Sequence, residues 1–180
     1  PTAYGSLPNT QANRIDLALP GALPVLNQGA LDMAIRFGLA TDSTVNQTIS
    51  FDRKNYFYPD LPKGYQTTQD KTPICVGGRI PLFGDALSQE FVELHHIHLE
   101  EDAGKSIHDD GLSTLIDLNR AGTPLIEIVT NPTIKGPEEA AACLQEIRRM
   151  VRYLGIGDAN MEKGEMRCDT NISIKKKRNS

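Results

Sequence analysis

Carboxylates, imidazoles and fixed cations gather in two apolar-flanked runs of the sequence. Residues 95–105 read HHIHLEEDAGK, and residues 116–129 read IDLNRAGTPLIEIV. Burying such groups costs on the order of several kcal/mol each unless they are paired or bind a metal. The two runs are therefore predicted to form a site.

The acidic residues suit a magnesium ion. Oxygen ligands on strands or strand ends match the octahedral site that Mg²⁺ completes with water and phosphate oxygens. These residues are Glu100, Glu101, Asp102, Glu127 and, near the end of the chain, Asp169. Lys105 and Arg120 could neutralise a phosphate, so the set predicts phosphoryl transfer, in which positioning and charge neutralisation supply most of the catalysis. The sequence has no GxxxxGK[ST] loop, which argues against a P-loop nucleotide site.

His98 is the histidine most closely tied to this set. Strand periodicity points it the same way as Glu100, so it is a candidate metal ligand or a partner of one. A His-x-His zinc site is not favoured, because no other cysteine or histidine has matching spacing. The cysteines, Cys75, Cys143 and Cys168, are widely spaced, odd in number and without an adjacent base. They argue against a disulfide framework and against a cysteine nucleophile, and they fit a reducing compartment.

Strands must position most of these groups. The longest is predicted over residues 89–101, where a period of two places Val92, Leu94, His96, His98 and Glu100 on one face. Alternation also predicts strands over residues 48–58, 114–119, 125–130 and 165–175, and a hairpin around Gly77-Gly78 within residues 73–83. In the last strand, Cys168 is expected on the core face and Asp169 on the polar face.

Two helices are predicted, over residues 25–40 with Asn27 as N-cap, and between Gly136 and Gly155. The buried stripe of the second helix is expected to be Ala140, Leu144, Ile147, Val151 and Leu154. Residues 1–24 are rich in Pro, Gly and Asn and should be irregular. Because strands dominate and the helices do not alternate with them, we expect an α+β domain with a mainly antiparallel sheet and flanking helices.

Composition limits the partners. A chain of 180 residues can bury one ordinary core, and its net charge of −4 provides no general basic field for a polyanion such as DNA. No apolar run approaches the roughly 20 residues of a membrane span, and no secretory signal is visible. We therefore expect neither DNA nor a membrane as a partner.

Several stretches together resemble the B subunit of the bacterial and organellar aspartyl/glutamyl-tRNA amidotransferase. The run at residues 116–129 has the form of that family's signature. The other matching stretches, in family order, are residues 19–27, 51–66, 100–105 and 167–173. The resemblance covers nearly all of the chain.

The resemblance implies a glutamine-synthetase-like catalytic domain, the cradle domain of the family. Residues 1–180 would be an internal piece of it, without the start of the domain and without the helical and tail domains that follow. The implied enzyme is a carbon–nitrogen ligase with glutamine as amido donor, found in the cytoplasm or an organelle. It uses ATP and Mg²⁺ to phosphorylate the side-chain carboxylate of Glu-tRNA(Gln) or Asp-tRNA(Asn). Ammonia from the A subunit then gives the amide, and a C subunit completes the assembly.

Carried over to this sequence, Glu100, Glu101 and Asp169 match acidic positions of the family's Mg²⁺ site. Lys105, Arg120 and Glu127 lie within family motifs, and we interpret them as phosphate neutraliser, phosphate or carboxylate binder, and site organiser. Further metal ligands of the family should precede Pro1, so the fragment alone is expected to be inactive. No zinc is expected, because Asn13 and Asp16 occupy the positions of a family Cys-x-x-Cys.

Three alternatives stay open at this point. The chain could be a scaffold that binds the A subunit and tRNA without chemistry, its carboxylates merely pairing with Arg120, Lys105 and Arg167. It could also be a glutamine-synthetase-like ligase for a small carboxylic acid. Four aromatic residues could either pack a sheet or form a platform near a nucleotide or the tRNA acceptor end; they are Tyr56, Phe57, Tyr58 and Tyr65.

Overall fold

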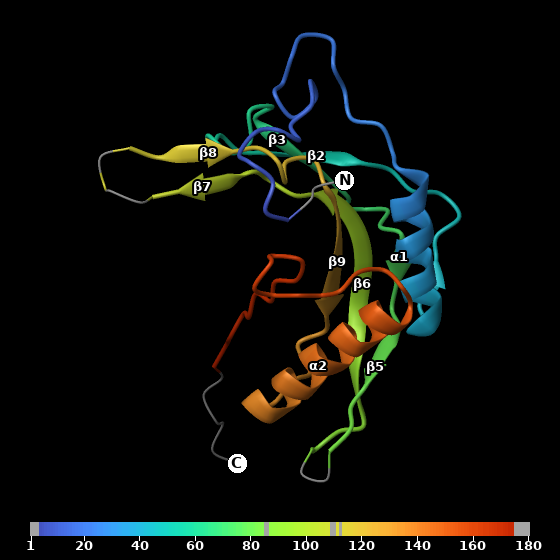
Figure 1. Ribbon diagram of the computed structural model, residues 1–180. Helices are drawn as coiled ribbons and strands as arrows, with labels where there is room; N and C mark the ends of the chain where they lie inside the picture. The colour runs from blue at the N-terminus through green and yellow to red at the C-terminus, as the bar shows by residue number, and fades with distance from the viewer. Residues whose placement is uncertain (1–3, 85–86, 109–110, 112, 175–180) are drawn as a thin grey trace.

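The computed structural model describes residues 4–84, 87–108, 111 and 113–174 of the chain (Figure 1). Its elements, in order, are α1 (Gln28–Ala40), β1 (Thr44–Val45), β2 (Asp52–Asn55), β3 (Tyr65–Thr68), β4 (Cys75–Val76), β5 (Arg79–Pro81), β6 (Phe91–Glu101), β7 (Lys105–Ile107), β8 (Leu115–Asp117), β9 (Pro124–Thr130) and α2 (Pro137–Tyr153). Every strand pairing among the described residues is antiparallel. The predicted α+β class is confirmed. Within the described ranges, neither helix combines the length and the apolar composition that a membrane span needs.

The eleven-residue strand β6 is the centre of the five-stranded sheet. β9 pairs with one edge of β6, and β4 and β5 pair with the other edge. β1 extends the sheet beyond β4. Figure 1 shows β6 and β9 running side by side through the middle of the molecule. The long strand predicted at residues 89–101 is thus confirmed, and it presents its side chains to both faces of the sheet.

The predicted hairpin at Gly77-Gly78 is wrong. β4 and β5 do not pair with each other; both pair with β6, in one continuous register from Cys75 opposite Ile97 to Pro81 opposite Phe91. The two glycines adopt φ of +66° and +98° and bend the strand without reversing it. A Cβ on Gly78 would lie 2.2 Å from the Oγ of Ser43 and 2.7 Å from the carbonyl oxygen of Thr41. Glycine is therefore required at position 78 because the segment Thr41–Ser43 packs directly against it.

A β-bulge changes which side chains of β6 share a face. The register against β9 shifts between Leu94 and His96, so one extra residue lies on β6. The core face therefore carries Val92 and Leu94 before the shift and Ile97 and Leu99 after it. Placing Val92 and Leu94 on the face of His98 and Glu100 was wrong, because unbroken alternation cannot anticipate a bulge.

Both helices pack on the core side of the sheet, in one cluster of buried side chains. Asn27 caps α1, its Oδ1 accepting from the backbone N–H of Ala30 at 3.2 Å, as predicted. α2 starts with Pro137 and stops before Gly155, also as predicted. Three residues of its expected buried stripe, Ile147, Val151 and Leu154, pack against the core as predicted, but they are only partly buried. The fully buried residues of α2 are Glu139, Cys143 and Glu146, which were not expected. Glu139 is buried because its carboxylate accepts hydrogen bonds from Ser88, Gln89 and Lys135.

Two further hairpins flank the sheet. β2 pairs with β3, and β3 contacts β6 near its C-terminal end. The strand predicted at 48–58 is shorter than expected because its partner offers only four residues. β7 pairs with β8, and this hairpin extends away from the sheet (Figure 1).

The strand predicted at residues 165–175 is not present in its described part, residues 165–174. No described strand pairs with this segment, and Cys168, expected in the core, is exposed. Alternation shows only that a segment suits a pleated surface, whereas a strand is stabilised by the neighbour that pairs with it.

Candidate active site

His98, Glu100 and Glu127 converge on one face of the sheet. Two positions along β6 separate His98 from Glu100, so they point the same way, and Glu127 of β9 lies directly opposite His98 in the ladder. The Nε2 of His98 is 3.5 Å from the Oε2 of Glu100 and 3.7 Å from the Oε2 of Glu127. One ligand atom from each residue falls within 4.8 Å of the others, a spacing that a single metal ion could bridge.

The β2–β3 hairpin helps to enclose this face of the sheet. The hydroxyl of Thr68, on β3, donates to the Oε2 of Glu100 at 3.3 Å. His98 and Glu100 are buried, whereas the side chain of Glu127 is 48% exposed. The group is therefore open on the Glu127 side.

The two carboxylates have different protonation tendencies. Burial raises the pKa of Glu100, but the hydrogen bond and charge of His98, with smaller contributions from Lys54 and Thr68, bring its pKa below the ordinary value. Burial and then the charge of Glu100 raise the pKa of Glu127. Glu100 therefore loses its proton at a lower pH than Glu127. A cation bound between them would favour the ionised form of both.

The histidines orient one another. The Nδ1 of His95 is 2.6 Å from the Nδ1 of His96, and the Nε2 of His96 is 3.0 Å from the Nδ1 of His98. Burial lowers the pKa of His96, and the neighbouring imidazoles of His98 and His95 lower it further. A neutral His96 can thus hydrogen-bond to the Nδ1 of His98. The Nε2 of His98 then faces the carboxylates.

Glu101 faces away from this group. Its Oε1 forms an ion pair with Lys63 and accepts from the backbone N–H of Thr67 at 2.8 Å. The side chains of Lys63 and Glu101 are only 7% and 9% exposed. The structure therefore gives Glu101 a buried cationic partner and does not bring it together with His98, Glu100 and Glu127.

Arg120 holds the turn that follows β6. Its Nε donates to the carbonyl of Ala103 at 3.1 Å and its Nη2 donates to the carbonyl of Gly104 at 2.9 Å, and its Nε pairs with the carboxylate of Asp102 at 3.2 Å. Lys105, the first residue of β7, is exposed and lies opposite Asp117 in the register. Arg120 is thus engaged with the protein, while the amine of Lys105 is accessible to solvent.

Asp169 lies in the irregular segment after α2. Its carboxylate is 3.5 Å from the Nε of Arg167, and both side chains are about three-quarters exposed, at 76% and 75%. It is not part of the only three-residue metal-type group found among the described residues.

Asn13 and Asp16 lie in one turn near the start of the chain, where the backbone N–H of Asn13 donates to the Oδ2 of Asp16 at 2.9 Å.

Sequence reasoning missed Lys54 and Thr68 as neighbours of the group. Lys54 is exposed on β2 and acts electrostatically on both Glu100 and Glu127, and Thr68 is bonded to Glu100. Lys54 belongs to the stretch at 51–66 that resembles the family, which was a usable signal. No local pattern indicated that β3 would contact β6.

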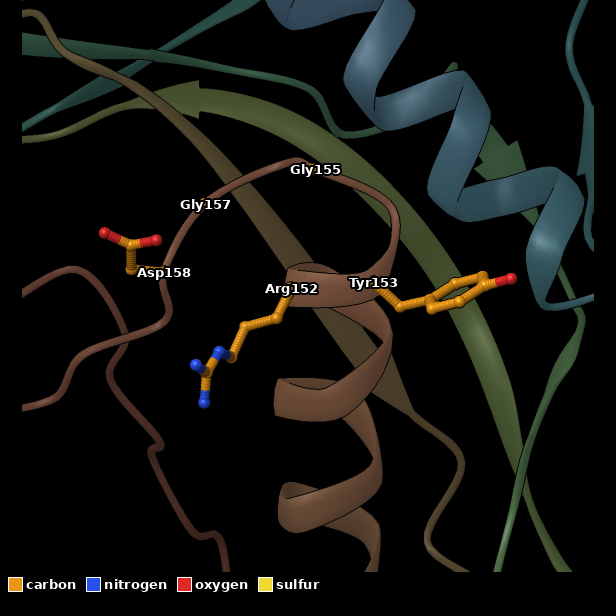
Figure 2. A pocket seen from close by; sticks show the side chains of 5 residues that line it. All are labelled: Arg152, Tyr153, Gly155, Gly157 and Asp158. Carbon is orange, nitrogen blue, oxygen red and sulfur yellow. The ribbon is translucent and has the colours of Figure 1, made fainter.

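A separate hollow of about 480 Å³ lies at the end of α2. Figure 2 shows Arg152 and Asp158 directed to one side of it and the ring of Tyr153 directed to the other. None of its lining residues belongs to the group on β6 and β9, so we place the candidate chemistry at that group.

Comparison with known proteins shows the family to which the chain belongs. A model of the GatB/GatE catalytic domain matches residues 1–180. The chain is 55% identical to the B subunit of the aspartyl/glutamyl-tRNA(Asn/Gln) amidotransferase of Dechloromonas aromatica (strain RCB), over 98% of this chain and 37% of the relative. It is 53% identical to the protein of the same name from Azoarcus sp. (strain BH72) and 55% identical to that of Marinobacter nauticus, with the same coverages. The chain thus spans 37% of the length of these curated relatives.

Proposed function

Because the chain belongs to the GatB/GatE catalytic-domain family, we propose that it is part of the B subunit of a glutamine-dependent tRNA amidotransferase. ATP phosphorylates the side-chain carboxylate of glutamate attached to tRNA(Gln), or of aspartate attached to tRNA(Asn). Ammonia from the A subunit then displaces the phosphate and forms the amide. The phosphorylation is needed because a carboxylate is a poor acceptor for ammonia, whereas an acyl phosphate carries a leaving group.

The convergence of His98, Glu100 and Glu127 is the observation that carries this proposal. Two carboxylates and one imidazole suit a divalent cation such as Mg²⁺ that keeps several waters, and the open Glu127 side leaves room for phosphate oxygens. When bound, the ion would neutralise the charge of the transferring phosphoryl group. Ligation by Glu101 or Asp169 would require Lys63 or Arg167 to release them, so we propose His98, Glu100 and Glu127 as the ligands.

The surrounding cations have distinct proposed roles. Lys54 lowers the pKa of both carboxylates through its charge and is exposed, so it can bind a phosphate or the substrate carboxylate. Lys105 is exposed and can neutralise a phosphate. Arg120 keeps the turn at Asp102–Gly104 in place, which positions the end of β6. We also propose that ATP is the co-substrate.

The remaining features of the proposal come from the family. The assembly would contain the A and C subunits and a misacylated tRNA, in the cytoplasm of a bacterium or in an organelle. The names of the relatives describe each of them as one subunit of a tRNA amidotransferase, which supports a multi-subunit ligase that acts on tRNA. The mainly antiparallel sheet with helices on one face is compatible with a glutamine-synthetase-like domain.

A non-catalytic scaffold is the second candidate, and one observation favours it. Three acidic residues expected at the site are each paired with a cation of this chain: Glu101 with Lys63, Asp102 with Arg120 and Asp169 with Arg167. Pairings of this kind are what a purely structural role requires. Glu100 and Glu127 differ, since the group closest to both carboxylates is the imidazole of His98 and not a lysine or arginine.

ADP release separates these candidates. The full-length subunit, assembled with its partners, is given Mg²⁺, ATP and one of three acceptors: Glu-tRNA(Gln), uncharged tRNA(Gln) or free glutamate. The proposal predicts rapid ADP release when Glu-tRNA(Gln) is the acceptor, and none with uncharged tRNA(Gln) or free glutamate. No release with any acceptor would support the scaffold, and release with free glutamate would support a ligase for small carboxylic acids.

A further inference from the structure

The stretch Arg53–Tyr58 reads RKNYFY, two cations followed by three aromatic residues within six positions and without an acidic side chain. Phe57 is 89% exposed and Tyr58 is 65% exposed. Large aromatic side chains that pack so little on their own chain are typical of surfaces that bind something else. With the adjacent cations Arg53 and Lys54, this stretch is positively charged, whereas the chain as a whole has a net charge of −4.

The loop that carries these rings is held in one conformation. The backbone N–H of Tyr56 donates to the carbonyl of Gly64 at 3.1 Å, and that of Leu61 to the carbonyl of Tyr58 at 3.0 Å. The ring of Phe57 lies so close to Gly64 that a Cβ there would be 3.0 Å from it. Tyr56 and Tyr58 contact edge to face, with centroids 5.7 Å apart. The backbone that carries the exposed rings is therefore fixed, which lowers the entropic cost of stacking.

The same loop is fastened to the end of β6 that carries the acidic motif. The backbone N–H of Gly104 donates to the carbonyl of Asp60 at 2.9 Å, and Lys63 forms the buried ion pair with Glu101. The loop that carries Phe57 and Tyr58 is therefore fixed to the C-terminal end of β6, the strand that also carries His98 and Glu100.

We propose that Phe57 and Tyr58 form a stacking platform for the unpaired bases at the 3′ end of a tRNA, with Arg53 contacting the phosphate backbone. The inference rests on the proposed function, which places an amino acid esterified to that 3′ end at His98, Glu100 and Glu127. The bases next to the ester are single-stranded, and aromatic faces stack on any base. The adjacent cation complements the phosphates in charge.

A binding cycle tests this assignment in the full-length assembled complex. Dissociation constants are measured at one fixed salt concentration for intact tRNA(Gln) and for tRNA(Gln) lacking its last three nucleotides. The proteins compared are wild type, Phe57→Ala, Phe57→Tyr and, as a matched control, Tyr153→Ala. Tyr153 is 90% exposed, on α2 and far from this loop in sequence, with its ring directed away from Arg152 and Asp158 (Figure 2).

The platform predicts that Phe57→Ala weakens binding of intact tRNA by about tenfold, as expected for losing one stacked base, and leaves the truncated tRNA unaffected. Phe57→Tyr, which keeps a π face, should bind intact tRNA like wild type, and Tyr153→Ala should change neither constant. Equal effects of Phe57→Ala on both tRNAs, or no effect, would overturn the inference. Loss of co-purification with the other subunits would overturn it too and would assign the rings to a protein interface.

The cycle measures binding alone, so its outcome is separable from that of the proposed function. If the wild-type complex amidates Glu-tRNA(Gln) with ADP release but the cycle shows no coupling, only the platform is refuted. If the wild-type complex does neither, the proposed function fails whatever the cycle shows.

Discussion

Replacing Lys63 with methionine tests how the loop of aromatic residues is held to β6. Lys63 and Glu101 form an ion pair with side chains only 7% and 9% exposed. Removing one partner of such a pair costs about 3–5 kcal/mol, because it leaves a buried charge uncompensated. Glu101 keeps its bond from the backbone N–H of Thr67, so we expect the lower end, about 3 kcal/mol. That corresponds to roughly a hundredfold change in the local opening equilibrium.

Amide hydrogen exchange measures this change locally. The backbone N–H of Thr67 donates to Glu101, so its exchange rate reports opening of the contact between β3 and β6. We expect Lys63→Met to accelerate exchange at Thr67 by about a hundredfold. The double variant Lys63→Met/Glu101→Gln should recover much of the protection, because the buried charge is gone and an acceptor remains.

A matched control uses an exposed ion pair. Arg79 and Asp42 pair at 3.3 Å with side chains 58% and 73% exposed, and such pairs contribute at most about 1 kcal/mol. Arg79→Met should therefore leave exchange at Thr67 unchanged. Unchanged exchange in Lys63→Met would refute the reasoning, since the buried pair would then contribute nothing to holding the loop.

Three further predictions concern other parts of the molecule. Burial, and next the charge of Glu100, raise the pKa of Glu127 above its ordinary value of 4.5. The protonated side chain of Glu127 therefore stabilises the folded state fully below pH 4.5, and this stabilisation is lost as the pH rises through the pKa of the folded state. Glu127→Gln should then raise the melting temperature at pH 8 without metal but not at pH 4, and should remove any stabilisation by Mn²⁺. Gly78→Ala should lower the melting temperature more than Gly77→Ala. An alanine at either position would have a positive φ, at a cost of about 1–3 kcal/mol, but only the Cβ at position 78 would also clash with the Oγ of Ser43. Burial raises the pKa of the Cys143 thiol to about 11, so iodoacetamide at pH 7.5 should modify the exposed Cys168 and spare Cys143 until the protein is denatured, as mass spectrometry would show.

The sequence alone was enough to predict part of the site. A period of two over a long strand placed His98 and Glu100 on one face, and that pairing is found in the structure. The contribution of Glu127 depended on the register between β6 and β9, which the bulge between Leu94 and His96 shifts by one residue. Local alternation carries no information about such a shift, so the position of Glu127 opposite His98 could not be derived.

Long-range contacts account for the other differences. Gly77-Gly78 has the composition of a hairpin turn, but the strand continues because both of its halves find a partner in β6. The segment at residues 165–174 has the alternation of a strand, yet pairing depends on a neighbour and not on its own pattern. Lys54 reaches the site only because β3, its partner hairpin strand, contacts β6.

The most direct test of the central claim is ADP release by a Glu100→Gln variant. The full-length subunit, assembled with its partners, is supplied with Mg²⁺, ATP, glutamine and Glu-tRNA(Gln), and ADP, amide and glutamate are followed together. Glu93→Gln, an exposed change on the same strand, serves as the control. We predict that Glu100→Gln loses both ADP release and amidation, while glutamine hydrolysis by the partner continues and Glu93→Gln behaves like wild type. Wild-type rates of ADP release in Glu100→Gln would contradict the assignment of the phosphorylation site to His98, Glu100 and Glu127.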